Sequence, residues 1–205
     1  SETSLSQYFS VHPTHPQQRL LKQAAEIVSR GGLVVYPTDT TYALGCHIGD
    51  KTALDRVRQI RRLDKHHDLT LVCRDPSELG TYARVDNAAY RILKRLTPGP
   101  YTFLVKASRE VPRRLQHPKK KTIGLRVPDH AIALALLELH GEPLLTTTLR
   151  MPGDEHPLND AREIRERLVS VTDRVGDLVL VADGLSEGDV VALDAHDRLG
   201  DGIPV

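Results

Sequence analysis

The sequence predicts an α/β fold in which helices flank a single twisted sheet of mixed parallel and antiparallel strands. Short apolar runs alternate with amphipathic stretches along the 205 residues, which is the order of strands and helices in such folds. Two strand patterns, at 101–105 and 122–127, follow one another with no helix between them, which favours a mixed sheet. Because no repeat and no linker is visible, residues 1–205 are expected to form a single domain.

The individual elements are predicted from apolar spacing and from the residues that begin or end each stretch. Pro16 suits the first position of a helix that the Gly31-Gly32 pair would end, and Asp50, Asp86 and Asp129 can each cap a following helix. The predicted helices cover 16–29, 51–62, 76–82, 87–95, 130–141 and 160–169. The predicted strands cover 33–36, 69–73, 101–105, 122–127, 144–149, 178–181 and 190–193.

The most informative stretch is 31–46, which reads GGLVVYPTDTTYALGC. Its apolar start is typical of a buried strand, and Pro37 removes a backbone donor and so ends the strand's pairing. Thr38, Asp39, Thr40 and Thr41 then place short polar side chains where open α/β sheets tend to bind ligands. A turn whose side chains bond only to its own backbone is the alternative interpretation.

Two further strands carry polar side chains on one face. Thr122, Gly124 and Arg126 alternate with apolar residues, and Thr146, Thr148 and Arg150 lie opposite Leu145 and Leu149. An arginine on a central strand is costly to bury unless it is paired. The pattern therefore predicts a cavity for an anionic ligand, and an edge strand with its arginine in solvent is the alternative.

The net charge of +1 conceals a basic middle of the chain. Between positions 106 and 126 the single acid is Glu110, and such a surface can meet phosphate or RNA. A solvated surface loop is the alternative. The residues predicted to form a basic concave face that binds RNA are Lys106, Arg109, Arg113, Arg114, Lys119, Lys120 and Lys121.

Several kinds of chemistry have no support in the sequence. Near Gly45 a phosphate-binding loop is almost matched, but Asp50 stands where its second glycine should be, and a carboxylate would repel phosphate. His47, His66 and His67 lack the spacing of metal ligands, and no nucleophile–base order is present. We therefore predict neither a catalytic side chain nor a metal ligand.

The bulk composition bears on location. No apolar run approaches the 18 or so residues of a membrane span, so no contact with a membrane is expected. Cys46 and Cys73 are isolated in apolar surroundings, and buried free thiols indicate a reducing compartment. The predicted location is the cytoplasm.

Three motifs carry a resemblance to a known family. Residues 32–46, the TPGPYTF stretch at 97–103 and the IGLRVPDH stretch at 123–130 resemble the signatures of the YrdC/YciO family, in the same order and with matching spacing. The resemblance spans about 16–182 and is strongest to the YciO branch. It implies a YrdC-like fold and the site residues of that family.

The family includes the threonylcarbamoyl-AMP synthases, which combine L-threonine, bicarbonate and ATP, with Mg²⁺, into an adenylate used to modify tRNA. The resemblance maps the family's threonine turn onto Thr38 and Thr40 and its strand arginine onto Arg126. Such a reaction can proceed by positioning and charge neutralisation alone. The resulting candidate site for substrate and nucleotide comprises Tyr36, Pro37, Thr38, Thr40, Arg61, Thr122, Arg126, Thr148 and Arg150.

Two motifs depart from the synthases. Their K-x-R pair aligns with Arg61 and Leu63, and their S-x-N pair aligns with Thr148 and Arg150. Two functions stay open: the intact Pro37-Thr38 turn and Arg126 favour the first, whereas Leu63 and Arg150 favour the second. One is a weak or altered threonylcarbamoyl-AMP synthase that binds ATP and L-threonine. The other is a non-catalytic module that binds double-stranded RNA, tRNA or the ribosome through the basic face, without base stacking because only 4% of the residues are aromatic.

Overall fold

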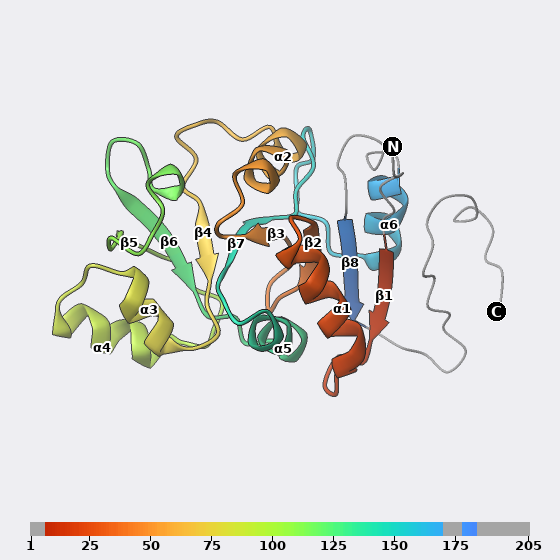
Figure 1. The fold of residues 1–205 in the computed structure, drawn as a ribbon, viewed down its shortest axis with the longest axis horizontal. Coiled ribbons are helices and arrows are strands. Elements are labelled where there is room, and N and C mark those ends of the chain that lie inside the picture. The colour runs from red at the N-terminus through yellow and green to blue at the C-terminus, as the bar shows by residue number, and fades with distance from the viewer. Residues whose placement is uncertain (1–6, 170–177, 184–205) are drawn as a thin grey trace.

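The strands of the protein form one sheet, described here from a computed structural model for residues 7–169 and 178–183. They are β1 (Gln7–Val11), β2 (Leu33–Pro37), β3 (Tyr42–His47), β4 (Thr70–Val72), β5 (Phe103–Lys106), β6 (Thr122–Arg126), β7 (Leu144–Thr148) and β8 (Leu178–Asp183). Their order across the sheet is β1-β8-β2-β3-β7-β4-β6-β5 (Figure 1). β8 is parallel to β1 and β2, and β4 is parallel to β6, whereas the other neighbours are antiparallel. The predicted mixed sheet is confirmed.

The six predicted helices are all present, with small differences at their first turns. They are α1 (Gln18–Ser29), α2 (Lys51–Arg61), α3 (Pro76–Tyr82), α4 (Asn87–Leu96), α5 (Ala131–His140) and α6 (Ala161–Val169), and a short 3-10 helix η1 (Arg113–Leu115) precedes β6. Pro16 lies outside α1, which begins two residues later. The cap of α5 is His130 and not Asp129, because the His130 side chain accepts the Ile132 N–H. Asp50 and Asp86 cap α2 and α4 as predicted.

Two strands were not predicted. β3 forms a hairpin with β2, in which Leu33 pairs with Cys46 and Pro37 with Tyr42. Its sequence shows no alternation because it is buried on both sides, and a Cβ at Gly45 would lie 3.2 Å from the Tyr36 ring and 3.3 Å from a backbone oxygen of β7. β1 was also missed and pairs with β8, and the strand predicted at 190–193 lies outside the described residues.

Helices cover the two faces of the sheet unequally. One apolar core lies under α2, α3, α4, η1 and α6, and the other lies under α1 and α5, which pack side by side (Figure 1). The second core takes no described residue from β5 or β6. On this side of the sheet, α1 and α5 therefore do not cover β5 and β6. Cys46 and Cys73 are buried free thiols, as expected. Among the described helices, none combines the length and the apolar character that crossing a membrane requires.

Candidate small-molecule site

The turn between β2 and β3 is held by its own threonines. Thr38 N–H donates to the Thr41 carbonyl over 3.2 Å, and the Thr38 hydroxyl donates to the same oxygen over 2.6 Å. The Thr38 and Thr40 hydroxyl oxygens lie 3.2 Å apart. Because Pro37 pairs with Tyr42 at the end of the hairpin, the turn starts from a rigid base. Its polar side chains are therefore presented in one arrangement.

An ion pair joins this turn to the other side of the site. Arg126, at the end of β6, donates to the Asp39 carboxylate, and the two side chains are 14% and 12% exposed. Arg126 also donates to the Thr40 hydroxyl over 3.2 Å. The Oδ2 of Asp39 and the Nε of Arg126 are buried and form no hydrogen bond with any described residue. The pair spans β7 and β4, which lie between β3 and β6 in the sheet.

A small cavity lies beside this ion pair, where Ala43 and Val72 at the edge of the α1/α5 core meet the threonines of β4 and β7. Its volume of about 50 Å³ is several times the 10–15 Å³ or so that one water needs. Gly124 of β6 has no room for a side chain, since a Cβ there would meet the Thr70 hydroxyl at 2.5 Å. The lining is rich in hydroxyl groups and comprises Thr38, Thr41, Tyr42, Ala43, Thr70, Val72, Thr102, Arg126, Thr146, Thr147 and Thr148.

The predicted site residues are only partly brought together here. Thr38, Arg126 and Thr148 line the cavity, and Thr40 contacts Arg126. Tyr36 is fully buried, and its hydroxyl donates to the Thr146 hydroxyl over 3.3 Å. Burial raises the pKa of Tyr36 to about 12. Pro37 is buried at the end of β2, where it anchors the turn.

Two residues predicted to line the same cavity do not do so. Thr122 shares the strand face of Arg126, but its hydroxyl donates to Asp68 over 3.3 Å. Arg150 follows the end of β7 and is exposed. Leu149 N–H still donates to the Tyr42 carbonyl of β3, but the chain then turns, since Arg150 N–H donates back to the Thr148 carbonyl. Strand parity therefore does not extend to Arg150.

Arg150 belongs to a second, cationic group with Arg61 and His67. Arg61 is in the last turn of α2, is only 9% exposed, and its side chain makes no hydrogen bond or ion pair with another described residue. Burial and then the Arg150 charge lower the pKa of Arg61. Partial burial of the ring, followed by the Arg61 charge, lowers the pKa of His67. Leu63, which aligns with a synthase cation, instead packs against the main core.

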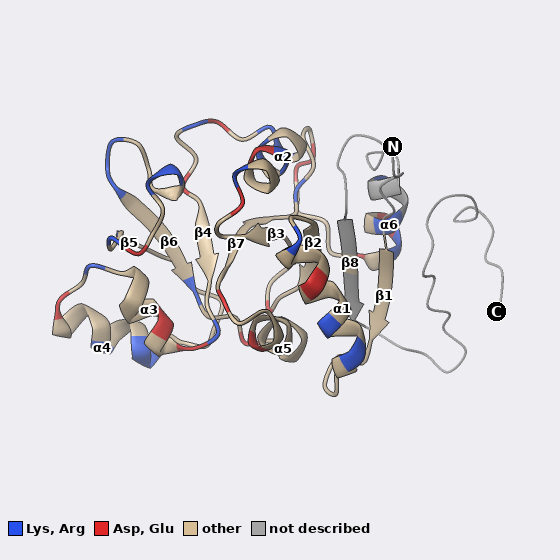
Figure 2. Cartoon of the chain, in the orientation of Figure 1, with Lys and Arg blue, Asp and Glu red and all other residues tan. Residues whose placement is uncertain are grey.

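The residues predicted to bind RNA have mixed roles. Arg114 donates to the Ile48 and Gly49 carbonyls, and Lys106 donates to the Lys120 carbonyl, so both hold loops together. Arg109 is 95% exposed and contacts Glu110. Arg113 and the three lysines 119–121 are exposed, and Figure 2 shows these lysines on the loop that leads into β6. None of the seven lines the cavity among the residues that the structure describes.

Sequence reasoning missed several members of the site. Asp39 was seen as part of the turn, but its pairing with Arg126 links positions 87 residues apart. Thr70 alternates with Leu69 and Leu71, the signal that identified the faces of β6 and β7, and could have been found in the same way. Thr102 falls within the 97–103 motif, and its direction depends on the pairing of β5 with β6.

The fold and the cavity define an α/β protein with a small, hydroxyl-lined cavity on a mixed sheet. A family model named Sua5_yciO_yrdC and described as "Telomere recombination" matches residues 26–190. The chain belongs to this Sua5/YciO/YrdC family.

Relatives of known sequence or structure fall within the same family. A protein of Escherichia coli K12 named "Uncharacterized protein YciO" is 55% identical over 171 residues, 83% of each chain, and a threonylcarbamoyl-AMP synthase of Chromobacterium violaceum is 34% identical over 169 residues, 80% of this chain and 86% of the relative. The crystal structure of E. coli YciO matches with a TM-score of 0.79 at 50% identity over 92% and 95% of the two chains. P. abyssi Sua5 complexed with L-threonine matches with a TM-score of 0.74 at 25% identity, over 84% of this chain and 49% of the other.

The ion pair predicts a measurable coupling between Asp39 and Arg126. Arg126→Ala should lower the free energy of unfolding by about 3 kcal/mol, because it leaves the Asp39 carboxylate mostly buried without its partner. The double variant with Asp39→Ala should cost less than the sum of the single variants. Urea unfolding measures both, and the control is Arg109→Ala, which breaks an exposed pair with Glu110 and should cost about 1 kcal/mol or less. Additive effects would contradict a coupled pair.

The lowered pKa of His67 predicts an acid sensitivity. When the folded pKa lies below the unfolded value of about 6.5, the unfolded chain binds the proton more readily, so stability is lost as the pH falls below about 6.5. His67→Gln should therefore lose less stability than wild type between pH 7.5 and 5.5 in urea unfolding. Arg150→Asn should show an intermediate loss, because Arg150 supplies a smaller part of the shift. An unchanged pH dependence in His67→Gln would refute this origin.

Proposed function

We propose that this protein binds a small amino acid of the L-threonine class beside ATP and joins them slowly, through bicarbonate, into a threonylcarbamoyl adenylate. The single observation that carries the proposal is Arg61, a residue only 9% exposed whose Nε is buried with no hydrogen bond to a described residue and whose pKa is lowered partly by the charge of Arg150. Burying a cation is costly unless it is paired, so this arrangement favours an anionic ligand. A polyphosphate chain offers the required charge.

The amino-acid end of the site rests on the Asp39–Arg126 pair. The pair holds one carboxylate oxygen and one guanidinium N–H without partners. An amino-acid zwitterion carries the complementary groups, so its carboxylate can exchange with Asp39 on Arg126 and its ammonium can bind Asp39. The hydroxyl groups of the lining suit the short polar side chain of threonine. P. abyssi Sua5, with a TM-score of 0.74, has been obtained with L-threonine bound.

The phosphate end rests on Arg61, Arg150 and His67. A polyphosphate beside them would neutralise Arg61 and relieve the repulsion by which Arg150 lowers its pKa. His67 would then take up a proton more readily, because its pKa is lowered partly by these arginines. Mg²⁺ would arrive with the nucleotide as part of the substrate. The phosphate end is thus a preformed group of cations, whereas the amino-acid end is electrically balanced before the ligand arrives.

The proposed reaction needs no nucleophile from the protein. The amine of threonine adds to bicarbonate, water leaves, and an oxygen of the resulting carbamate attacks the α-phosphorus of ATP with loss of pyrophosphate. The chain would position the carbamate and hold the phosphate charge. Arg150 in place of a neutral amide, and the apolar Leu63 in place of a cation, are the reasons to expect slow turnover. In the family that the chain resembles, such an adenylate serves tRNA modification.

We further propose a cytoplasmic location. Cys46 and Cys73 are both buried free thiols, which suits a reducing compartment. The substrates invoked here are also those of the cytoplasm's translation chemistry.

The synthase proposal predicts that pyrophosphate release depends on threonine. ATP, Mg²⁺, bicarbonate and L-threonine should give pyrophosphate and an adenylate detected by mass spectrometry, and omission of threonine should abolish both. Arg61→Ala should weaken ATP binding about 10-fold or more, since a charge-assisted contact contributes roughly 1.5–3 kcal/mol. Arg62→Ala is the matched control, because Arg62 follows in sequence but is exposed, and it should change affinity less than twofold. Equal losses in both variants, or pyrophosphate release without threonine, would overturn the proposal.

A second candidate function is binding of duplex RNA through lysines 119–121. These three side chains are exposed, so they can contact phosphate. They lie outside the cavity lining. This function would be independent of the adenylate chemistry and could exist with or without it.

The RNA function predicts a salt dependence set by those lysines. A plot of the logarithm of the affinity for duplex RNA against the logarithm of the salt concentration should be a straight line. Each phosphate contact should contribute roughly −0.7 to −0.9 to its slope. Replacing Lys119, Lys120 and Lys121 by Ala should flatten the slope by up to about 2–3 units. The control removes the same charge from exposed positions of α4, with Arg91, Lys94 and Arg95 replaced by Ala, and should keep the slope. Wild type that binds no RNA at low salt would exclude this function.

A further inference from the structure

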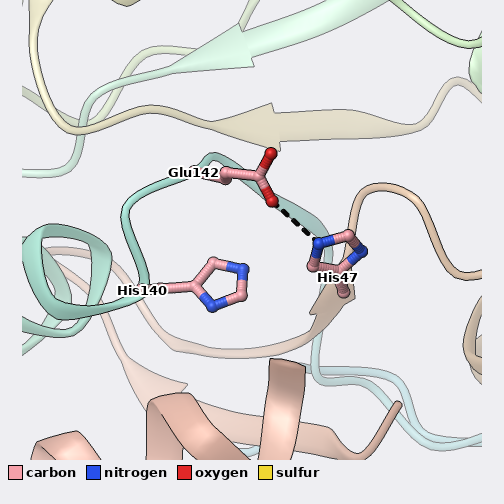
Figure 3. A group of neighbouring side chains, drawn as sticks. All are labelled: His47, His140 and Glu142. Carbon is pink, nitrogen blue, oxygen red and sulfur yellow. Dashed lines mark hydrogen bonds and ion pairs between the residues drawn. The ribbon is translucent and has the colours of Figure 1, made fainter. Parts of the chain in front are cut away.

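A group of two histidines and a glutamate lies at the opposite end of β3 from the threonine turn. His47 ends β3, His140 ends α5, and Glu142 follows two residues later, before β7 begins (Figure 3). β3 and β7 pair so that His47 lies opposite Leu144, which brings the three side chains together. Their ligand atoms all lie within 4.8 Å of one another. Five residues of extended β3, roughly 17 Å, separate this group from the turn at Tyr42.

The hydrogen bonds of His140 leave one ring nitrogen free. The Ser29 hydroxyl donates its proton to the Ala25 carbonyl over 2.9 Å, so its 3.3 Å contact with His140 Nδ1 requires that Nδ1 carries the hydrogen. The Nε2 of His140 then has a lone pair, and this atom is buried with no hydrogen bond to a described residue. Metal-binding histidines commonly donate their other N–H to an oxygen in this way, which fixes the ring.

His47 and Glu142 supply the other two ligand atoms. His47 Nε2 and Glu142 Oε2 are 2.8 Å apart, and His47 Nδ1 accepts the Gly49 N–H over 2.8 Å (Figure 3). The Nε2 of a neutral His47 therefore carries a proton that points at the carboxylate. A cation that takes the place of this proton moves it to Nδ1, and Gly49, which is exposed, must then donate to water. That exchange costs one hydrogen bond and leaves the fold unchanged.

Between these ligands the chain is shaped by Gly141. Its φ of 80° is the left-handed conformation that ends α5, and a Cβ built there meets nothing within 4 Å. This turn returns the chain so that Glu142, 54% exposed, reaches His47. A tetrahedral centre with bonds of about 2.0–2.1 Å holds its ligands roughly 3.4 Å apart. The three ligand atoms, now within 4.8 Å of one another, would adjust to that spacing on binding a cation.

We propose that His47, His140 and Glu142 form a binding site for a divalent cation of the Zn²⁺ class. Two imidazoles and one carboxylate are ligands that suit Zn²⁺, and three protein ligands leave a fourth position open for water. The site links the end of β3, the end of α5 and the start of β7, so bound Zn²⁺ stabilises the folded chain by joining the sheet to a helix that covers it. Its distance from the cavity makes it independent of the adenylate reaction.

The test is a titration of the whole chain with Zn²⁺ against a chromophoric chelator, because ten histidines could bind the cation nonspecifically. Wild type should bind one equivalent, and His140→Ala should bind it about 100-fold or more weakly. Glu142→Gln should also bind it more weakly, and this change at an exposed position preserves the fold. Ser29→Ala, which only frees the ring of His140, should weaken binding about 10-fold. Wild type should also show a rise in melting temperature with Zn²⁺ that His140→Ala lacks.

The matched control removes a different pair of imidazoles. His12 and His15 have ring centroids 5.4 Å apart, close to the 5.5 Å between His47 and His140, but they belong to no such group of ligands among the described residues. Replacing both by Ala should leave the affinity within twofold of wild type. If wild type, His140→Ala and Glu142→Gln bind Zn²⁺ with the same affinity, the proposal is wrong. His47 and Glu142 then form only a solvated ion pair, with His140 beside it.

Discussion

The contact on which the site depends is the ion pair between Asp39 and Arg126. One partner comes from the turn after β2 and the other from the end of β6, and two strands, β7 and β4, run between them. Those strands place threonines below the pair where a core would have leucines, so an open volume remains on the sheet. Both charged groups are nearly buried, and neither could stay there alone without a large penalty.

The same pair would let an electrically balanced site bind the zwitterionic ligand that we propose. An incoming zwitterion would place its carboxylate against Arg126 and its ammonium against Asp39. Because its own charges cancel, its binding would bury no net charge. The cations at Arg61 and Arg150 are different, because the described residues offer them no counter-charge. A ligand that spans both places would need a zwitterionic end and a strongly anionic end, which is the charge pattern of an amino acid next to a nucleoside triphosphate.

The sheet also separates these features from the rest of the molecule. The cavity lies between the threonine turn and Arg126, at the edge of the core under α1 and α5, whereas the histidine–glutamate group lies where α5 ends against β3 and β7. The basic loop before β6 lies outside the cavity lining. Three surfaces with different chemistry therefore share one scaffold, and a change at one can be tested without disturbing the ligands of another.

The sequence alone determined the parts of this protein that depend on local physics. The buried strand before Pro37, the caps at Asp50 and Asp86 and the polar face of β6 all follow from spacing and side-chain type within a few residues. Tertiary structure decided what depends on strand register. β3 became visible only through its pairing with β2, and Asp39 contacts Arg126 only because β6 lies three strands beyond β3. Arg150 does not lie on the predicted face because the chain turns after Thr148. His47 contacts Glu142 because β3 pairs with β7. Such contacts join residues about 90 positions apart, and no local pattern encodes them.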